Sequence, residues 1–364
     1  MKLVVFGLTV SSSWGNGHAT LWRGLIMALA AHGHRTVFFE RDVPYYAGAR
    51  DCVALPNGEL VLYSDWPDVA SRARAELVDA DAAIVTSYCP DGIAAAALVC
   101  DNGRALKVFY DLDTPVTLTR LARGETLPYL GPRGLADFDL VLSYTGGGAL
   151  DALRTRLRAR RVMLLYGHVD PDVHRPEQAQ AHYRADLSYL GTYSPDRQAA
   201  LETLLIEPAR RRGRRRFLIG GAQYPDDFPW SPNIYFVRHL PPSEHPFFFC
   251  SSRLTLNVTR AAMAEMGWCP SGRLFEAAAC GKAVLTDTWA GLTDFFTPGN
   301  EILAAATTED ALAALDLDDA ELARIGRAAR ERTLAEHTSA RRAAELVAAL
   351  ESTAHAPAPT LMEA

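Results

Sequence analysis

The sequence lacks several features that mark whole classes of protein. None of its stretches approaches the ~20 consecutive apolar residues that a membrane-spanning helix needs. The apolar start, Met1–Val10, is too short for a signal peptide and has the pattern of a strand. No Cys-x-x-Cys pair occurs among the 6 cysteines, which argues against a zinc or disulfide framework and favours a reducing compartment. We therefore expect a cytoplasmic protein without an integral membrane segment.

An excess of positive charge is also missing. The formal net charge is -6, so we expect no nucleic-acid partner. One strongly basic run, Arg210–Arg216, stands between an expected helix and an expected strand. It has two interpretations: cations at a helix C-terminus, or contact with an anionic acceptor or lipid headgroup. The 364 residues, 49% of them hydrophobic and 22% charged, are typical of a globular chain with two domains.

Short apolar runs alternate with helical stretches along most of the chain. Such runs predict parallel strands covered by helices on both faces and joined by right-handed crossovers. The strands expected in the first half are Leu3–Gly7, Arg35–Phe39, Ala82–Thr86, Ala105–Tyr110, Leu140–Ser143 and Val162–Tyr166. Those expected in the second half are Leu187–Gly191, Phe217–Gly220, Ile234–Val237, Leu254–Val258 and Ala283–Thr286. The clearest helices are expected at Ala19–His32, Asp196–Pro208, Glu321–Arg332 and Ser339–Ser352.

The alternation stops once, in a segment that contains Pro171 and Pro176 and has neither a helical nor a strand period. This break predicts the joint between two domains. We therefore expect an α/β protein with two doubly wound, Rossmann-like domains facing a central cleft. The predicted parts are a domain at 1–168, a linker at 169–180, a domain at 181–338, a terminal helix at 339–352 and a Pro/Ala-rich, disordered tail at 353–364.

The loop after the first expected strand is rich in small residues. Ligands of open α/β sheets bind at the carboxyl ends of the strands. Gly15, Asn16 and Gly17 form a loop that opens a helix, and such loops offer backbone N–H groups to an anion. The glycines do not follow the Gly-x-Gly-x-x-Gly order of dinucleotide sites. His18 begins the helix, where it either faces a ligand or only caps and packs.

Two acids follow the expected strand Ala105–Tyr110. Asp111 ends that strand, and Asp113 directly precedes a helix that starts at Thr114. One interpretation is that Asp113 caps the helix. The other is that one of the two acids is the base that takes a proton from an acceptor hydroxyl.

Loops in the second half carry groups suited to a phosphate. Gly191 and Tyr193 follow one expected strand, and Arg197 lies in the next helical turn, from which its guanidinium can reach a diphosphate. Asn257 ends another expected strand, and Arg260 follows it. We expect all of these residues at one edge of the second sheet.

The stretch "SGRLFEAAACGKAVLTD", residues 271–287, carries the strongest signal. Ser271 and Gly272 leave a helix N-terminus open to phosphate oxygens, with Arg273 beside it. Glu276, one turn further, is within reach of a sugar diol of the same ligand, because a carboxylate accepts two hydroxyl hydrogen bonds. An isolated glutamate on a helix is usually solvated, but its place after Ser-Gly-Arg and between two strands favours a ligand.

These motifs resemble a known group. "RLFEAAACGKAVLTD", followed by "GLTDFFTPGNEIL", resembles the donor-site signature of GT-B glycosyltransferases, in particular the spore-maturation CgeB-type proteins and the GT4-like retaining clan (glycosyl transferases group 1). "YGHVDPDVHRP" is similar to the interdomain segment of that clan. "LGTYSPDRQ" is similar to its phosphate loop, with Arg197 in the place of a lysine. The resemblance is good over residues 185–310.

The resemblance implies an enzyme that uses a nucleoside-diphosphate sugar. Glu276 would hold the ribose, while Ser271, Gly272, Arg273 and Arg197 would hold the diphosphate. The domain at 1–168 would bind a hydroxyl acceptor such as a sugar, a lipid-linked sugar or a natural product. The terminal helix would pack back toward that domain. Neither a metal nor another cofactor is expected, because helix dipoles and basic side chains stabilise the departing diphosphate.

One departure from the clan leaves the stereochemistry open. The clan usually has a second glutamate eight residues before the ribose-binding one, where this chain has Trp268, and the nearest earlier acid is Glu265. If the reaction inverts, the base is one of His18, Asp111 and Asp113. If it retains, the donor phosphate deprotonates the acceptor. Two further functions stay open: a sugar-nucleotide epimerase on the same fold and a non-catalytic sugar-nucleotide-binding protein.

Overall fold

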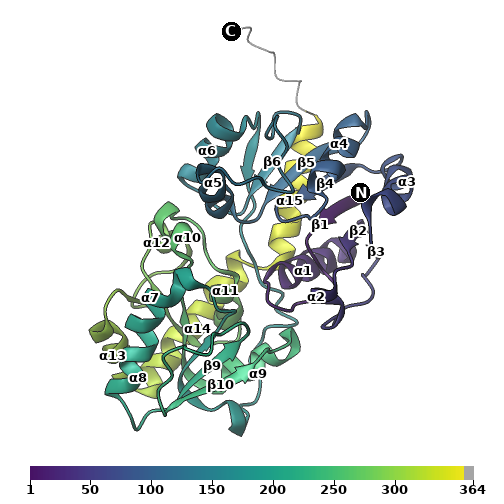
Figure 1. Cartoon of the computed structure of the whole chain (residues 1–364). Coiled ribbons are helices and arrows are strands. Elements are labelled where there is room, and N and C mark those ends of the chain that lie inside the picture. The colour runs from purple at the N-terminus through teal and green to yellow at the C-terminus, as the bar shows by residue number, and fades with distance from the viewer. Residues whose placement is uncertain (356–364) are drawn as a thin grey trace. The chain divides into compact units, whose positions relative to one another are not determined.

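The chain forms two compact units, seen in a computed structural model that describes residues 1–355 (Figure 1). Unit 1 comprises Met1–Ser12, Trp22–Tyr166 and the part of the last helix that begins at Ala340. Unit 2 comprises Ser13–Leu21 and Gly167–Ser339. The chain therefore passes from unit 1 into unit 2 after Tyr166 and returns to unit 1 after Ser339.

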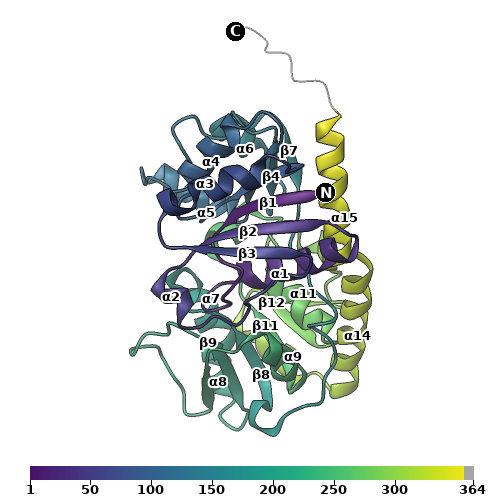
Figure 2. The same ribbon diagram turned by 90° about the vertical axis from the view of Figure 1, so that its right-hand side faces the viewer.

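Unit 1 is built on a parallel sheet of 7 strands in the order β3-β2-β1-β4-β5-β6-β7 (Figure 2). The strands are β1 (Lys2–Gly7), β2 (Arg35–Arg41), β3 (Gly58–Tyr63), β4 (Ala82–Thr86), β5 (Leu106–Asp111), β6 (Leu140–Ser143) and β7 (Val162–Leu164). Its helices are α1 (His18–Ala31), of which the first turn belongs to unit 2, α2 (Pro44–Ala47), α3 (Trp66–Leu77), α4 (Gly92–Asp101), α5 (Thr114–Ala122), α6 (Gly148–Leu157) and α15 (Ser339–Ala354). The central strand β4 is buried along its whole length, as is typical of a parallel strand covered by helices on both faces.

Unit 2 repeats this plan with a parallel sheet of 6 strands in the order β10-β9-β8-β11-β12-β13. The strands are β8 (Ala185–Leu190), β9 (Phe217–Gly221), β10 (Ile234–Arg238), β11 (Ser252–Asn257), β12 (Ala283–Asp287) and β13 (Leu303–Ala305). The longer helices are α11 (Gly272–Ala279), α13 (Thr308–Asp316) and α14 (Asp319–Glu336). The short ones are η1 (Ala181–Tyr183), η2 (Pro195–Arg197), α7 (Gln198–Leu201), η3 (Glu202–Ile206), α8 (Glu207–Arg211), η4 (Pro242–Glu244), α9 (His245–Cys250), α10 (Ala261–Met266) and α12 (Leu292–Phe295).

Helix α11 is the best-packed helix near the expected donor site. Its residues from Leu274 to Ala279 are all buried, because the alanines let it approach the sheet closely. Helix α14 lies alongside it (Figure 1). A Cβ at Gly326 of α14 would lie only 2.3 Å from the carbonyl oxygen of Gly281, so a glycine is needed where α14 crosses the turn after α11.

The predicted fold class, an α/β fold with two Rossmann-like domains, is confirmed. Every strand expected in either half forms, with ends that shift by no more than 2 residues. Two strands are additional: β3, an edge strand of half-buried residues, and β13, which has only 3 residues.

The helices differ more from their predictions. The single helix expected at Asp196–Pro208 is a series of short pieces, and its centre, Glu202–Ile206, is a π-helix. The last two expected helices are longer at one or both ends than predicted. Helix α15 continues to Ala354, so the first residues of the predicted tail are helical. The rest of that tail, residues 356–364, lies outside the described residues.

Candidate functional site

The N-terminus of α11 is organised as the sequence predicts for anion binding. Ser271 is the N-cap, and its hydroxyl accepts a hydrogen bond from the backbone N–H of Arg273 at 3.4 Å. The first turn of any helix leaves further N–H groups without intrahelical partners. Among residues 1–355, the Arg273 guanidinium has no hydrogen-bond or ion-pair partner. Both groups are therefore available to a phosphate.

Glu276 lies in the second turn of α11 and is 9% exposed. Burying a carboxylate costs free energy unless hydrogen bonds compensate for the lost water. No residue of the described part of the chain donates a hydrogen bond to this carboxylate. Its acceptor capacity is thus unused in the protein itself, which suits a ligand that presents hydroxyl groups.

Two histidines that the sequence analysis did not predict lie close to Glu276. His245, the first residue of α9, places Nδ1 3.9 Å from a carboxylate oxygen of Glu276. Its Nε2 lies 3.2 Å from the carbonyl oxygen of Leu240, to which it donates. The Nε2 atom of His174 lies 3.3 Å from the Nδ1 of His245. Since Nε2 of His245 carries the hydrogen, its Nδ1 is the acceptor and His174 the donor.

Burial keeps both imidazoles neutral. It lowers the pKa of His174 to about 3, and it lowers the pKa of His245 to about 4, although the nearby Glu276 opposes the latter shift. Both values lie well below 6.5, so neither ring carries a charge near pH 7. His245 therefore forms no ion pair with Glu276 under these conditions.

Four of the predicted donor residues gather around Tyr224, in the loop after β9. The Tyr224 hydroxyl donates to the carbonyl oxygen of Gly191 at 3.1 Å, and the rings of Tyr224 and Tyr193 lie 5.5 Å apart. Burial raises the pKa of Tyr224, and the positive charges of Arg197 and Arg273 oppose that rise. The structure thus brings these four predicted residues to one edge of the sheet, around an aromatic residue that the sequence analysis missed.

The arginines at this edge differ in their partners. Arg197 donates from Nη1 to the carbonyl oxygen of Thr192 at 3.2 Å, while its buried Nε makes no hydrogen bond with a described residue. Arg260 pairs with Asp196 at 3.2 Å. Arg197 therefore keeps hydrogen-bonding capacity for a ligand, whereas part of the charge of Arg260 is already compensated.

Asn257 connects strand ends. Its Nδ2 donates to the hydroxyl of Thr286 at 3.0 Å, which ties the end of β11 to the end of β12. Next to it, a carboxylate oxygen of Asp287 accepts hydrogen bonds from the backbone N–H and the hydroxyl of Thr259, both at 2.9 Å. These contacts hold the two loops that flank α11 in one arrangement.

Trp268, in the place of the clan's second glutamate, is a packing residue. Its Nε1 donates to Asp294 at 2.7 Å, and its φ angle of 45° is left-handed. A Cβ at Gly291 would lie 2.5 Å from the indole ring. The indole therefore fills the space beside Gly291 and is held there by its hydrogen bond to Asp294.

Asp111 is the most perturbed acid of unit 1. It is fully buried, and its Oδ1 accepts from the hydroxyl of Thr117 at 3.2 Å and from the N–H of Asp113 at 3.3 Å. Oδ2 makes no hydrogen bond with any described residue. Burial raises the pKa of Asp111 to about 6. Asp113 holds the N-cap position of α5, but its side chain makes no capping hydrogen bond.

The loop after β1 is ordered by an acid that the sequence analysis missed. Glu40, at the end of β2, is fully buried. Its carboxylate accepts from the hydroxyl of Thr9 at 2.9 Å, from the N–H of Val10 at 2.7 Å, and from Ser11, whose N–H and hydroxyl lie at 2.9 and 2.6 Å. A strand-end glutamate thus fixes the backbone that leads into the glycine loop.

The glycine loop itself begins α1. Gly15 has a φ angle of 65°, and the Asn16 side chain accepts from the N–H of Ala19 at 3.1 Å, so Asn16 caps the helix. His18 is the first residue of α1. Its segment belongs to unit 2, whereas Asp111 and Asp113 belong to unit 1, so no single unit holds all three candidate bases.

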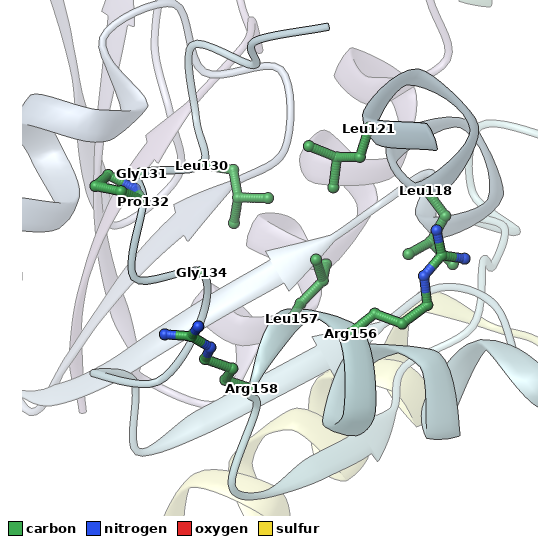
Figure 3. Close-up of a pocket in the computed structure, with 9 residues that line it drawn as sticks. All are labelled: Leu118, Leu121, Leu130, Gly131, Pro132, Gly134, Arg156, Leu157 and Arg158. Atoms are coloured by element: carbon green, nitrogen blue, oxygen red, sulfur yellow. The ribbon is translucent and has the colours of Figure 1, made fainter. Parts of the chain in front are cut away.

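A cavity in unit 1 has a different character. It has a volume of about 320 Å³ and is shown in Figure 3. Its lining consists of Leu118, Leu121, Leu130, Gly131, Pro132, Gly134, Arg156, Leu157 and Arg158. None of the predicted site residues lines it, so it adds nothing to the donor site.

The basic run Arg210–Arg216 is largely compensated. Ion pairs of 2.6 to 2.8 Å join Arg210 to Glu202, Arg211 to Glu309, Arg212 to Asp316 and Arg215 to Asp186. These contacts support the interpretation as solvated cations near the end of α8. In addition, no helix within residues 1–355 has the length and apolar character that crossing a bilayer requires.

Comparison with protein families relates the C-terminal part of the chain to a described family. The profile of a family described as "Glycosyl transferase-like" matches residues 197–348, which include the predicted donor residues other than Gly191 and Tyr193. Curated protein sequences give no significant match.

Solved structures match almost the whole chain. Sucrose-phosphate synthase from Thermosynechococcus elongatus is 14% identical and superimposes with a TM-score of 0.67, covering 96% of this chain and 98% of that one. The chain has the GT-B fold. HepE of Anabaena, solved with UDP and glucose, shares this GT-B fold at 14% identity and a TM-score of 0.66, covering 96% and 99% of the two chains.

A third GT-B structure bears on the expected partners. It is an alpha-glucosyltransferase solved with UDP and a 13-mer DNA, 12% identical with a TM-score of 0.71, covering 96% and 99% of the two chains. The GT-B fold by itself therefore does not exclude a nucleic-acid partner, and that expectation rests on net charge alone. The finer resemblance to the CgeB-type group stays a prediction.

Proposed function

We propose that this chain is a glycosyltransferase that moves a sugar from a nucleoside-diphosphate sugar to a hydroxyl acceptor. One observation carries the proposal. Glu276 is buried with unused acceptor capacity, one turn after a helix N-terminus and near the unpaired Arg273. A ligand that fits these groups has two neighbouring hydroxyls close to an anionic group, as a nucleoside diphosphate does.

The same groups account for the leaving group. The transfer leaves negative charge on the diphosphate, and donors aimed at that charge lower the barrier. The N–H groups at the start of α11, together with Arg273 and Arg197, supply positive electrostatic potential without a metal ion. The proposed reaction therefore uses no catalytic metal or other cofactor.

UDP-glucose is the natural first probe. HepE was solved with UDP-glucose, and the alpha-glucosyltransferase was solved with UDP. Both have the GT-B fold, and the family profile covers the proposed donor residues of this chain from Arg197 onward. We propose that unit 2 binds the donor and that unit 1 contributes to the acceptor side.

For the proton of the acceptor we favour Asp111. A pKa raised to about 6 by burial keeps this carboxyl close to the pH at which a general base is most effective. His18 and Asp113 are the other candidates. With Trp268 in place of a second glutamate, the anomeric configuration of the product decides between inversion, which needs such a base, and retention.

The decisive experiment compares two glutamine variants. Isothermal titration with UDP-glucose should show a roughly 10- to 150-fold weaker affinity for Glu276→Gln, which follows from losing a charged acceptor worth about 1.5–3 kcal/mol. The matched control is Glu265→Gln, since Glu265 is exposed on α10. Equal affinities for wild type and Glu276→Gln would remove the observation on which the proposal rests.

Product analysis separates the alternatives. A glycosyltransferase hydrolyses the donor slowly or transfers the sugar when an acceptor is supplied. An epimerase converts the donor alone into an isomeric nucleotide sugar. A non-catalytic binding protein binds the donor and leaves it intact.

A further inference from the structure

Three potential metal ligands converge in unit 2. Nε2 of His174, Nδ1 of His245 and a carboxylate oxygen of Glu276 all lie within 4.8 Å of one another. Two of the separations are 3.3 and 3.9 Å. Ligands of a tetrahedral zinc ion with bonds of about 2.0–2.2 Å stand roughly 3.4 Å apart. The two measured separations therefore lie within about 0.5 Å of the required spacing, and the third, between His174 and Glu276, is at most 4.8 Å.

The hydrogen bonds prepare the ligands for a cation. His245 donates its Nε2 hydrogen to the carbonyl oxygen of Leu240, so its Nδ1 carries the lone pair, which accepts the Nε2 hydrogen of His174 in the metal-free chain. A cation would replace that hydrogen, and the hydrogen of His174 would then sit on its Nδ1, which has no hydrogen-bond partner among the described residues. Metal-binding histidines generally donate their second N–H to a carbonyl or carboxylate, as His245 does. Glu276 accepts no hydrogen bond from a described residue. The Nδ1 atom of His245 and the carboxylate of Glu276 are thus two electron-pair donors with no hydrogen between them.

The ligands also come from three separate segments that the fold fixes. His174 lies in the chain between β7 and β8 and is 1% exposed, His245 begins α9, and Glu276 lies within α11. Ligands held on buried, packed elements lose little freedom on binding. Imidazole nitrogens select zinc and related transition metals over magnesium and calcium, which prefer oxygen ligands.

We propose that His174, His245 and Glu276 form a binding site for a divalent transition metal of the zinc class. The fourth position is left to water or another exchangeable ligand. The positive charge of Arg273 acts on His245 and opposes a cation there. We therefore expect an affinity in the micromolar range rather than that of a structural zinc site.

This site regulates rather than assists the proposed reaction. The regulatory part rests on the proposed function, because Glu276 is also the residue proposed to hold the ribose. A metal bound to its carboxylate takes the acceptor that the sugar hydroxyls need. Zinc should therefore compete with the nucleotide sugar, and a chelator should restore donor binding.

The test titrates the full-length chain, freed of metal by a chelator, with Zn²⁺ against a chromophoric competitor. His174→Phe keeps a buried ring of similar size and removes one ligand, and His245→Gln removes another. His182→Ala is the matched control, because His182 is an exposed histidine of η1. Wild type and control should bind one zinc per chain, and each ligand variant should bind at least about 10-fold more weakly.

Two outcomes overturn the inference. One is a wild-type affinity no tighter than that of the ligand variants. The other is an equal loss in His182→Ala. A second measurement does not depend on any variant: Co²⁺ added to the wild-type chain should produce the intense visible absorption of a tetrahedral site, and its absence also rejects the site.

The metal site and the proposed function can be tested independently of each other. The metal titration is done without nucleotide, so it tests the site alone. UDP-glucose titration in the presence of chelator tests the proposed function alone. When both bind, Zn²⁺ at ten times its dissociation constant should raise the apparent Kd of UDP-glucose about 11-fold if the two compete. An unchanged Kd would reject the regulatory coupling and leave the metal site standing.

Discussion

His245 approaches Glu276 to 3.9 Å without forming an ion pair with it near pH 7, because burial lowers the pKa of His245 to about 4. Its neighbour His174 is buried even more deeply, and the pKa of that ring is lowered to about 3. The carboxylate of Glu276 therefore lies beside two neutral rings. This arrangement has consequences for stability as well as for binding.

The first prediction concerns acid stability. His174 is neutral in the folded chain, whereas in the unfolded chain it takes up a proton below about pH 6.5. Its depressed pKa has no effect on stability well above pH 6.5 and disfavours folding as the pH falls below that value, by about 2 kcal/mol at pH 5. His174→Phe should remove this destabilisation. Urea unfolding at pH 5 and pH 8 should show a smaller difference for His174→Phe than for wild type, while exposed His182→Phe should behave as wild type.

The second prediction separates phosphate from nucleoside binding. Arg273 has no partner among residues 1–355, and we place it beside the diphosphate. Arg273→Gln should weaken the binding of UDP about 10-fold or more, because a charge-assisted hydrogen bond is lost. The affinity for uridine should not change. Calorimetry with both ligands measures this, with exposed Arg184→Gln as control; an equal effect on uridine would place Arg273 elsewhere.

The third prediction concerns Asp111. Burial raises its pKa from 3.8 to about 6, so the folded chain favours the protonated form. Ionisation of this buried acid opposes folding. Its destabilising contribution appears as the pH rises above about 4 and reaches about 3 kcal/mol above pH 6. Asp111→Asn should therefore stabilise the chain at pH 8 and have little effect at pH 4.

Thermal unfolding at both pH values measures this, and exposed Asp101→Asn is the control. If Asp111 is also the base, the more stable variant should lose transfer activity at pH 8. A variant that is less stable than wild type at pH 8 would contradict the assigned pKa shift.

The fourth prediction concerns Glu40, whose carboxylate accepts hydrogen bonds from Thr9, Val10 and Ser11. In Glu40→Gln, the amide NH₂ would face these N–H and O–H groups, and the negative charge would be lost. The substitution should therefore lower the free energy of unfolding by about 3 kcal/mol. Exposed Glu351→Gln, also in unit 1, should change it by less than about 0.5 kcal/mol. Chemical denaturation measures both, and similar small effects would show that the Glu40 network is dispensable.

The sequence predicted the central strands well because they are continuous apolar runs. Strand β4, five residues long and buried throughout, was predicted at its observed bounds. Strand β3 was missed because its residues are mostly half-buried and it lies at an edge, where the apolar pattern is weak. The break at Glu202–Ile206 has no marker that a pattern of apolar residues can detect.

Around Glu276, the sequence analysis related only residues that are neighbours along the chain. Glu276 and Arg273 share one helix, so spacing alone relates them. His174 and His245 are separated by 71 positions, and only the fold brings them to 3.3 Å. No local sequence pattern marks either histidine: His174 lies in the segment between the two expected domains, and His245 begins a short helix.

Gly326 of α14 leaves no room for a side chain, because its Cβ would lie 2.3 Å from the carbonyl oxygen of Gly281 in the turn after α11. Even a single added methyl at position 326 would collide with a backbone atom that cannot rotate away. Helix α14 would then have to move outward, and α11 would lose the neighbour that sets its depth against the sheet. The position of Glu276, and with it the proposed grip on the ribose, thus depends on the absence of a side chain at one position of a neighbouring helix.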